Sequence, residues 1–249
     1  MTPNSRLVIL SGPSCVGKSP LCAALARFHP ELQAKLHKLV LVNSRLPRPG
    51  EADGVDYHFR TRAQVETLRV DGRYALIEAR SDLQAVDVRE LESLLGRGDV
   101  LFEGNPYVAH ALQTHPGLGG VKRLSIFVSP LSREEIMYLK APERSLVLAD
   151  FVADVMRRKL LRRTTRQKGS LSASDLEEIE IRAGSAYREM QMAWQFDYVI
   201  VNHDGEDSEN WDAFHYPIGD ARKAVEAFAG LLRGEVPAGV EKWEERLMG

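Results

Sequence analysis

The chain has 249 residues, 44% hydrophobic and 27% charged, a composition that is ordinary for a globular protein. Its 33 Lys and Arg against 35 Asp and Glu give a formal net charge of -2, which excludes a general attraction to nucleic acid. No apolar run approaches the roughly 20 residues of a membrane span, and residues 1–5 lack secretory character. Two cysteines, Cys15 and Cys22, indicate neither a disulfide framework nor a metal site. We therefore expect a cytoplasmic protein without membrane or nucleic-acid partners, while the oligomeric state stays open.

Short apolar runs alternate with helical patterns along the chain. Strands are expected at residues 6–10, 38–43, 57–59, 74–78, 100–103, 124–128 and 198–201. Helices are expected at residues 20–28, about 62–70, 88–95, 106–115, about 147–163, about 175–194 and about 221–232. Residues 43–56 are expected to form a loop, and Ser172 or Ser174 is expected to cap the helix near residue 175. This alternation predicts an α/β fold with a mostly parallel sheet and helices on both faces.

Residues 12–19 read G-P-S-C-V-G-K-S and match the G-x-x-x-x-G-K-S pattern, between an expected strand and an expected helix. Glycines in this pattern let backbone N–H groups turn toward phosphate oxygens, and the helix N-terminus adds partial positive charge. The Lys18 ammonium can reach the β and γ phosphates, and the Ser19 hydroxyl can ligate Mg²⁺. The sequence therefore predicts ATP and Mg²⁺ as cofactors, with Lys18 also catalytic. The predicted nucleotide-binding residues here are Gly12, Ser14, Cys15, Val16, Gly17, Lys18 and Ser19.

Pro20 follows this loop, where many such loops carry a second hydroxyl. Because the first N–H groups of a helix have no intrahelical partner, proline is tolerated there and the helix should persist. A side-chain contact to the α-phosphate would be missing.

The loop after the second expected strand carries two arginines on a proline-stiffened turn. Residues 45–51 read R-L-P-R-P-G-E, and residues 54–59 read G-V-D-Y-H-F. Paired guanidinium groups suit bidentate capture of a phosphate dianion. These runs resemble the R-x-P-R-x-G-E and G-x-D-Y-x-F patterns with which guanylate kinases hold the GMP phosphate, and the resemblance spans about residues 6–203. It implies that Arg45, Arg48 and Tyr57 bind the acceptor phosphate.

The resemblance implies further roles for four residues. Glu78 and Asn105 would contact the acceptor base, Glu103 would lie near the metal, and Asn202 would lie near the ATP adenine. The chain also departs from the family, because residues 79–89 read A-R-S-D-L-Q-A-V-D-V-R where the family has G-x-x-Y-G-S/T. Asn105 replaces a usual aspartate, and because its amide donates as well as accepts hydrogen bonds, a different base edge becomes possible.

Basic residues crowd the region between residues 157 and 168, and Arg182 follows. In the family, arginines on two helices beside a mobile lid close over the transferred phosphoryl group. The resemblance favours Arg182 and Arg163 as these catalytic residues, with Arg162 or Arg166 as alternatives to Arg163. Phosphoryl transfer to a phosphate needs charge neutralisation and in-line positioning rather than a general base. A solvated helix face that binds no ligand is the alternative for many of these charges.

The predicted fold is α/β, a P-loop NTPase-type mostly parallel sheet flanked by helices, with a small NMP-binding subdomain and a helical lid. A single guanylate-kinase-like domain would cover residues 1–249. Its core would be about residues 1–43, 99–145 and 190–234, its NMP-binding subdomain 44–98, its lid region 146–189 and its tail 235–249.

The predicted function is ATP-dependent phosphorylation of a nucleoside monophosphate, with GMP as the first candidate acceptor. Two alternatives stay open. The altered segment 79–89 leaves room for another nucleotide or a phosphorylated sugar as acceptor. A non-catalytic phosphoprotein-binding module is the other alternative, although Lys18, Ser19 and the basic lid argue against it.

Overall fold

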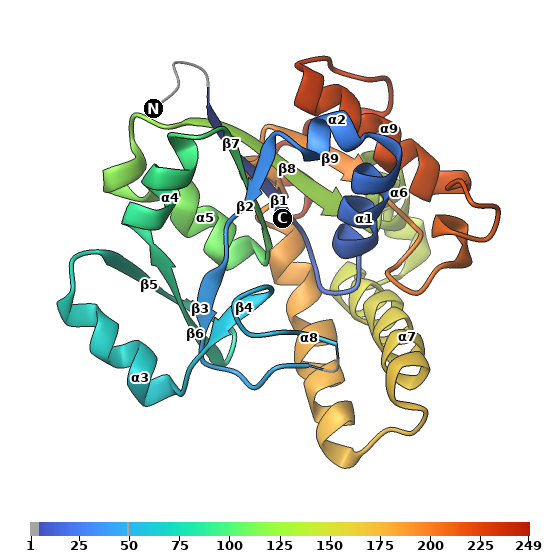
Figure 1. Ribbon diagram of the computed structural model, residues 1–249. Coiled ribbons are helices and arrows are strands. Elements are labelled where there is room, and N and C mark those ends of the chain that lie inside the picture. The colour runs from blue at the N-terminus through green and yellow to red at the C-terminus, as the bar shows by residue number, and fades with distance from the viewer. Residues whose placement is uncertain (1–4, 49) are drawn as a thin grey trace. The chain divides into compact units, whose positions relative to one another are not determined.

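The computed structural model describes residues 5–48 and 50–249, so residues 1–4 of the N-terminal segment and Pro49 of the predicted acceptor loop lie outside the described residues. The chain divides into two compact units. Unit 1 comprises residues 5–10 and 35–124 apart from 49, and unit 2 comprises residues 11–34 and 125–249. Both units combine strands with helices (Figure 1). None of the helices in the described ranges is long and apolar enough to span a membrane.

Unit 1 contains three neighbouring strands of mostly buried residues. They are β1 (Arg6–Ser11), β7 (Asp99–Gly104) and β2 (Leu36–Lys38), adjacent in that order, and β2 runs parallel to β7. Two helices belong to the same unit, α4 (Val88–Leu95) and α5 (Pro106–Thr114). The carboxylate of Asp87 caps α4 by accepting hydrogen bonds from two backbone N–H groups of its first turn.

A second, four-stranded sheet in unit 1 has the order β4-β3-β6-β5. Its strands are β3 (Leu41–Asn43), β4 (Tyr57–Phe59), β5 (Tyr74–Ala79) and β6 (Asp82–Asp87). The short helix α3 (Arg62–Thr67) starts at a Thr61 capping box and continues into a 3₁₀ turn. Val65 of α3 packs on Leu83 and Ala85 of β6, so α3 covers one face of this sheet.

Two sequence-based expectations for unit 1 are wrong or incomplete. Residues 38–43 are not one strand, because β2 ends at Lys38 and β3 begins at Leu41 in a different sheet. The Leu39 backbone N–H donates to the Leu101 carbonyl at 2.9 Å, so the chain leaves the first sheet just before it enters the second. Strand β6 was not expected, and it occupies much of the segment 79–89 in which the chain departs from the family pattern.

Unit 2 contains most of β8 (Lys122–Ser129), then β9 (Tyr198–Val201) and β10 (Val240–Glu241). The pair β8–β9 is parallel and β10 is antiparallel to β9. The Phe127 ring of β8 packs against Phe196 and Trp243, with ring centroids 5.3 and 6.5 Å apart. Parallel strands among helices thus agree with the predicted α/β class. The predicted tail, residues 235–249, contains β10 and the buried Trp243.

Six helices belong to unit 2: α1 (Lys18–Phe28), α2 (Pro30–Gln33), α6 (Arg133–Leu139), α7 (Leu148–Lys168), α8 (Ala173–Met190) and α9 (Gly219–Arg233). Helix α1 continues through Pro20, as expected. Helices α7 and α8 lie side by side as a long hairpin (Figure 1). Ser172 forms a capping box with Asp175 at the start of α8, whereas α7 extends five residues beyond its expected end at residue 163.

Candidate functional site

The phosphate-binding pattern forms a tight turn between β1 and α1. Gly12 and Gly17 have φ angles of +148° and +100°, and Gly17 is the N-cap of α1. A Cβ at Gly12 would lie 2.3 Å from the Val128 carbonyl oxygen, and one at Gly17 would lie 2.4 Å from the Asn202 amide nitrogen. Only glycine fits both the backbone angles and these close approaches. The turn therefore presents main-chain groups at a helix N-terminus, which suits an anion.

Charge at this N-terminus is positive. The first turn of α1 contains no acidic residue. The Lys18 ammonium donates to the carbonyl oxygens of Gly12 and Pro13, at 2.9 and 2.8 Å, so the buried lysine folds back over the loop. Cys15 and Val16 are fully buried, and burial raises the pKa of the Cys15 thiol to about 11. At neutral pH this thiol is therefore uncharged, and the residue can offer the site only its backbone.

Asn202 lies directly after β9 and is fully buried. Its side-chain amide donates to the Val16 carbonyl at 2.7 Å, and its backbone N–H donates to the Ser129 carbonyl at 2.8 Å. The residue thus ties the phosphate-binding turn to the ends of two parallel strands. Its expected contact with adenine stays a prediction.

The two predicted lid arginines lie on α7 and α8. Arg182 of α8 is buried, and its Nε donates to the Ser14 hydroxyl of the phosphate-binding turn at 3.1 Å. Arg163 of α7 donates to the Glu206 carboxylate at 2.6 Å. Burial acts to raise the pKa of that carboxyl, but the charges of Arg163, Lys18 and Arg182 hold it below its usual value. Unit 2 therefore brings Lys18, Ser14, Arg182 and Arg163 into one positively charged region around the ionised Glu206.

The predicted acceptor-phosphate residues meet in unit 1. The Arg45 guanidinium makes two hydrogen bonds of 2.6 Å to the Glu51 carboxylate, which also accepts from the Arg48 backbone N–H at 2.7 Å. Burial acts to raise the pKa of Glu51, but these bonds hold it below its usual value. The Arg45 guanidinium carbon also lies 5.1 Å from the centre of the Tyr57 ring, within cation–π range. Glu51 thus fixes the arginines, a role that its place in the R-x-P-R-x-G-E run could have signalled.

Tyr57 and Glu103 belong to the same electrostatic environment. Burial raises the pKa of the Tyr57 phenol, Arg45 and Arg48 oppose the shift, and the Glu103 carboxylate adds to it. The phenol is therefore neutral at physiological pH and can donate a hydrogen bond. Glu103 is half-buried near the end of β7, and Asn105 follows this strand. The Asn105 side-chain oxygen caps α5 by accepting from the Val108 N–H at 3.0 Å, and its NH₂ group can still donate to a base.

The structure does not bring Glu78 to these residues. Cross-strand partners share a face of a sheet, and the pairs Val42–His58, Val42–Ala85 and Ala85–Leu76 place Glu78 on the α3 face. There its carboxylate accepts a 2.6 Å hydrogen bond from Arg62 and is 57% exposed. Tyr57 lies on the opposite face, because neighbouring residues of a strand point to opposite sides.

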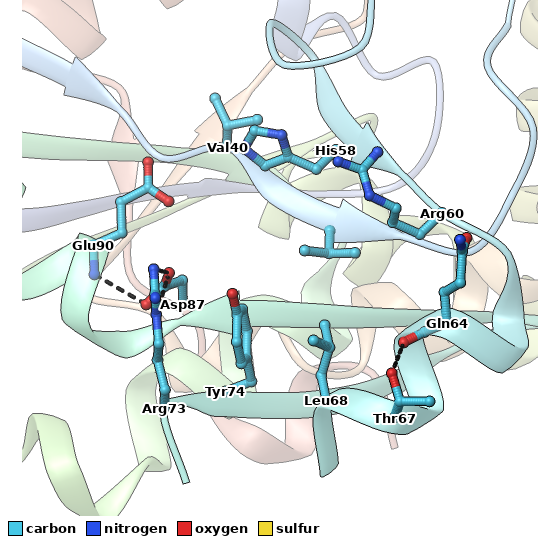
Figure 2. A pocket seen from close by; sticks show the side chains of 11 residues that line it. Val40, His58, Arg60, Gln64, Thr67, Leu68, Arg73, Tyr74, Asp87 and Glu90 are labelled. Carbon is cyan, nitrogen blue, oxygen red and sulfur yellow. Dashed lines mark hydrogen bonds and ion pairs between the residues drawn. The ribbon is translucent and has the colours of Figure 1, made fainter. Parts of the chain in front are cut away.

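A pocket of about 470 Å³ opens on the α3 face of the small sheet (Figure 2). Its lining residues include Val42, His58, Arg60, Leu68, Tyr74 and Glu90. None of the residues predicted to bind nucleotide, acceptor or metal lines this pocket. The cavity is therefore separate from the acceptor-phosphate residues by the thickness of a sheet.

Comparisons with known proteins show the family of the chain. The family model described as guanylate kinase matches residues 4–81, ending just before β6. The guanylate kinase of Synechococcus sp. (strain JA-3-3Ab) is 32% identical over 215 residues, covering 85% of this chain and 82% of that protein. The guanylate kinase of Rickettsia bellii (strain RML369-C) is 29% identical over 212 residues, covering 84% and 92%. The chain belongs to the guanylate kinase family.

A solved structure supports the fold of this guanylate kinase family member. The crystal structure of guanylate kinase from Anaplasma phagocytophilum matches with a TM-score of 0.55 at 20% identity, covering 92% of this chain and 85% of that one. The expected α/β fold with mostly parallel strands flanked by helices is thereby confirmed. Glu206 has no place in the family patterns quoted above, and no local signal in the sequence marks it as a partner of Arg163.

Proposed function

We propose that this protein is a guanylate kinase that transfers the γ-phosphoryl group of ATP to GMP, giving ADP and GDP. The observation that carries the proposal is the cationic phosphate-binding turn of unit 2, in a chain that belongs to this family. Backbone N–H groups at the start of α1, the Lys18 ammonium and the Arg182 guanidinium converge there. We also propose that the protein acts in the cytoplasm.

In this function the phosphate-binding turn holds ATP. The N–H groups of residues 14–19 bind the phosphates, and Lys18 exchanges its two carbonyl partners for β- and γ-phosphate oxygens. Arg182 and Arg163 neutralise the charge that spreads over the transferred phosphoryl group. Asn202 keeps the turn in place and borders the adenine.

For Mg²⁺, the Ser19 hydroxyl of unit 2 would be a ligand, because this ion prefers hard oxygen ligands. The Glu103 carboxylate of unit 1 offers the same kind of ligand, and its predicted place near the metal stays a prediction. Within residues 5–48 and 50–249 no three His, Cys, Asp or Glu side chains gather as a metal site. When bound, the ion would supply positive charge that offsets the charge of the phosphates.

The acceptor phosphate would bind Arg45, Arg48 and Tyr57. Glu51 supports this role because its carboxylate fixes both the Arg45 guanidinium and the Arg48 backbone. The neutral Tyr57 phenol donates to a phosphate oxygen. Because the attacking phosphate oxygen is already ionised, no general base is required.

The test is a coupled ADP-release assay with ATP, Mg²⁺ and GMP, comparing the wild-type protein with Lys18→Ala. Loss of this buried cation is expected to lower turnover about 10²-fold or more. Full activity in Lys18→Ala would contradict the mechanism. Calorimetric titration with ATP and Mg²⁺ separates the enzyme from a non-catalytic phosphoprotein-binding module, which would not bind ATP.

A different acceptor is the second candidate, favoured by the place of Glu78. This carboxylate pairs with Arg62 on the α3 face, so the residue expected to read guanine lies away from Tyr57. The same assay over nucleoside monophosphates, deoxynucleotides and phosphorylated sugars decides between the two. A preference for GMP above about a hundredfold, ~2.7 kcal/mol in transition-state binding, would remove this alternative.

A further inference from the structure

One face of α7 holds the segment that follows β9. Lys159, Arg162, Arg163 and Arg166 recur at helical spacing and so share that face. The Lys159 ammonium donates to the His203 carbonyl, and Arg166 donates to the Asp207 carbonyl at 2.9 Å. The Arg162 guanidinium lies 3.3 Å from the Asp207 carboxylate. Residues 203–207 are therefore fixed beneath four cations.

Glu206 is an enclosed acid of this segment. Its carboxylate and the Arg163 guanidinium are 2.6 Å apart, and their side chains are only 16% and 12% exposed. Water and salt screen such a pair far less than an ion pair at the surface. Removing or adding one charge here should therefore strongly change the electrostatic potential at the neighbouring cations.

The same segment is attached to the phosphate-binding turn. The Glu206 backbone N–H donates to the Cys15 carbonyl at 3.3 Å. The Trp211 indole donates to the Gly205 carbonyl at 2.9 Å and also helps to hold the segment in place. Lys18 and Arg182, together with Arg163, stabilise the ionised carboxylate of Glu206. These are the three side chains to which we assign the ATP phosphates. The Glu206 carboxylate therefore offsets part of the positive charge that would bind the phosphates.

We propose that Glu206 is an internal counter-ion that competes with the phosphates of the nucleotide for Arg163. This inference rests on the proposed function, because it assumes that ATP binds at the same turn. A triphosphate brings about four negative charges beside Glu206, and like charges at short range repel. Arg163 can contact phosphate in two ways. Either its guanidinium leaves Glu206, or it keeps that hydrogen bond and donates to phosphate from another nitrogen. One such donor is at hand, since Nε of Arg163 is buried without a hydrogen-bond partner among the described residues.

Glu206→Gln tests the proposal, because glutamine keeps the shape and the acceptor oxygen but removes the charge. The measurement is calorimetric titration with ATP in excess Mg²⁺. We expect Glu206→Gln to bind ATP about fivefold or more tightly than the wild type, in the range of coupling between close charges. A merely structural role predicts the opposite sign, since damage to the segment weakens binding. Equal or weaker binding by a folded Glu206→Gln protein would overturn the proposal.

Two control variants separate charge from other effects. Glu206→Asp keeps the charge on a shorter side chain and should show no gain in affinity. Glu180→Gln removes a carboxylate that pairs with Arg157 at 2.7 Å on the same two helices, outside the phosphate-binding turn, and should also show no gain. A gain in either control equal to that in Glu206→Gln would overturn the specific role of Glu206.

A double variant keeps the test decisive if Glu206→Gln folds poorly. Arg163→Gln combined with Glu206→Gln replaces the ion pair by a neutral amide pair, and it should bind ATP more tightly than Arg163→Gln alone. Equal affinity of these two proteins would overturn the proposal. Absence of ATP binding by the wild-type protein would instead contradict the proposed function, so the two failures are distinguishable.

Discussion

The phosphate-binding turn and the acceptor loop achieve rigidity in different ways. In the turn at residues 12–19, Gly12 and Gly17 face main-chain or amide atoms so closely that no side chain fits. In the acceptor loop, Gly50 has no described atom within 4 Å of the position that a Cβ would take, and the loop depends on the Glu51 carboxylate instead. A site built from main-chain geometry tolerates almost no substitution at its glycines. In a site that depends on one carboxylate, a change of that single residue can alter the binding affinity.

Gly17→Ala should have the largest effect, because it breaks the region that depends on main-chain geometry. The new methyl group would lie 2.4 Å from the Asn202 amide and 3.1 Å from the Trp211 ring, at a φ of +100°. We expect ATP affinity to fall about a hundredfold or more, measured by calorimetry. Gly184→Ala is the matched control, since Gly184 is exposed in α8 with no described atom near the added methyl group. It should leave ATP affinity unchanged and raise the free energy of unfolding by about 0.5–1 kcal/mol.

Glu51→Ala should have an intermediate effect confined to the acceptor. Without the carboxylate, the Arg45 guanidinium and the Arg48 backbone lose their shared partner, and the loop must be ordered when the acceptor binds. We expect KM for GMP to rise about tenfold to a hundredfold in steady-state assays, with KM for ATP within about twofold of wild type. An equal rise in both constants would contradict the independence of the two regions.

Cys15 provides a smaller, chemical test of the enclosed turn. Burial raises the pKa of its thiol to about 11, so at pH 8 only about one molecule in a thousand carries a thiolate. We expect iodoacetamide at pH 8 to leave Cys15 unmodified in the folded protein and to modify it after denaturation in urea. Peptide mapping by mass spectrometry measures both, with the half-buried Cys22 as an internal comparison. Modification of Cys15 as fast in the folded as in the unfolded protein would contradict this description of the turn.

Lys38→Ala should have the smallest effect and sharpens the contrast with Glu51. Lys38 pairs with Asp56 at 3.3 Å beside the acceptor loop, but its side chain is half exposed. Exposed pairs contribute little, so we expect a change below about 0.5 kcal/mol in the free energy of unfolding, measured in urea. KM for GMP should stay within about twofold of wild type. A larger rise would mean that peripheral charges, and not Glu51 alone, organise the loop.

The phosphate-binding turn could be predicted from the sequence because its backbone angles dictate residue types over eight neighbouring positions. A family pattern marks Arg45, Arg48 and Tyr57, so their meeting in unit 1 could be predicted, while their binding of the acceptor stays a prediction. The face on which Glu78 lies could not be predicted. It depends on the register of β5 and β6, which is set by a two-residue connection at Arg80 and Ser81 with a φ of +60° at Arg80. Arg-Ser is not a residue pair that signals such a turn.

Glu206 shows a second limit of sequence reasoning. It lies 43 positions from Arg163, beyond any helical or strand periodicity, so only the folded chain brings the two together. The strand at Val240–Glu241 was missed for a similar reason, since two residues make no detectable pattern and their pairing with β9 is a tertiary contact. Local geometry could thus be predicted, whereas partners that are distant along the chain could not.

Strand β4 also limits how this protein can change in length. Its three residues alternate between the two faces of the small sheet, with Tyr57 on the acceptor face and His58 on the α3 face beside the pocket. A single inserted or deleted residue within the strand would exchange these faces, placing an imidazole where the phenol was. Changes in length are therefore expected to accumulate in the exposed connection between residues 52 and 55, where an added residue leaves the alternation of β4 intact.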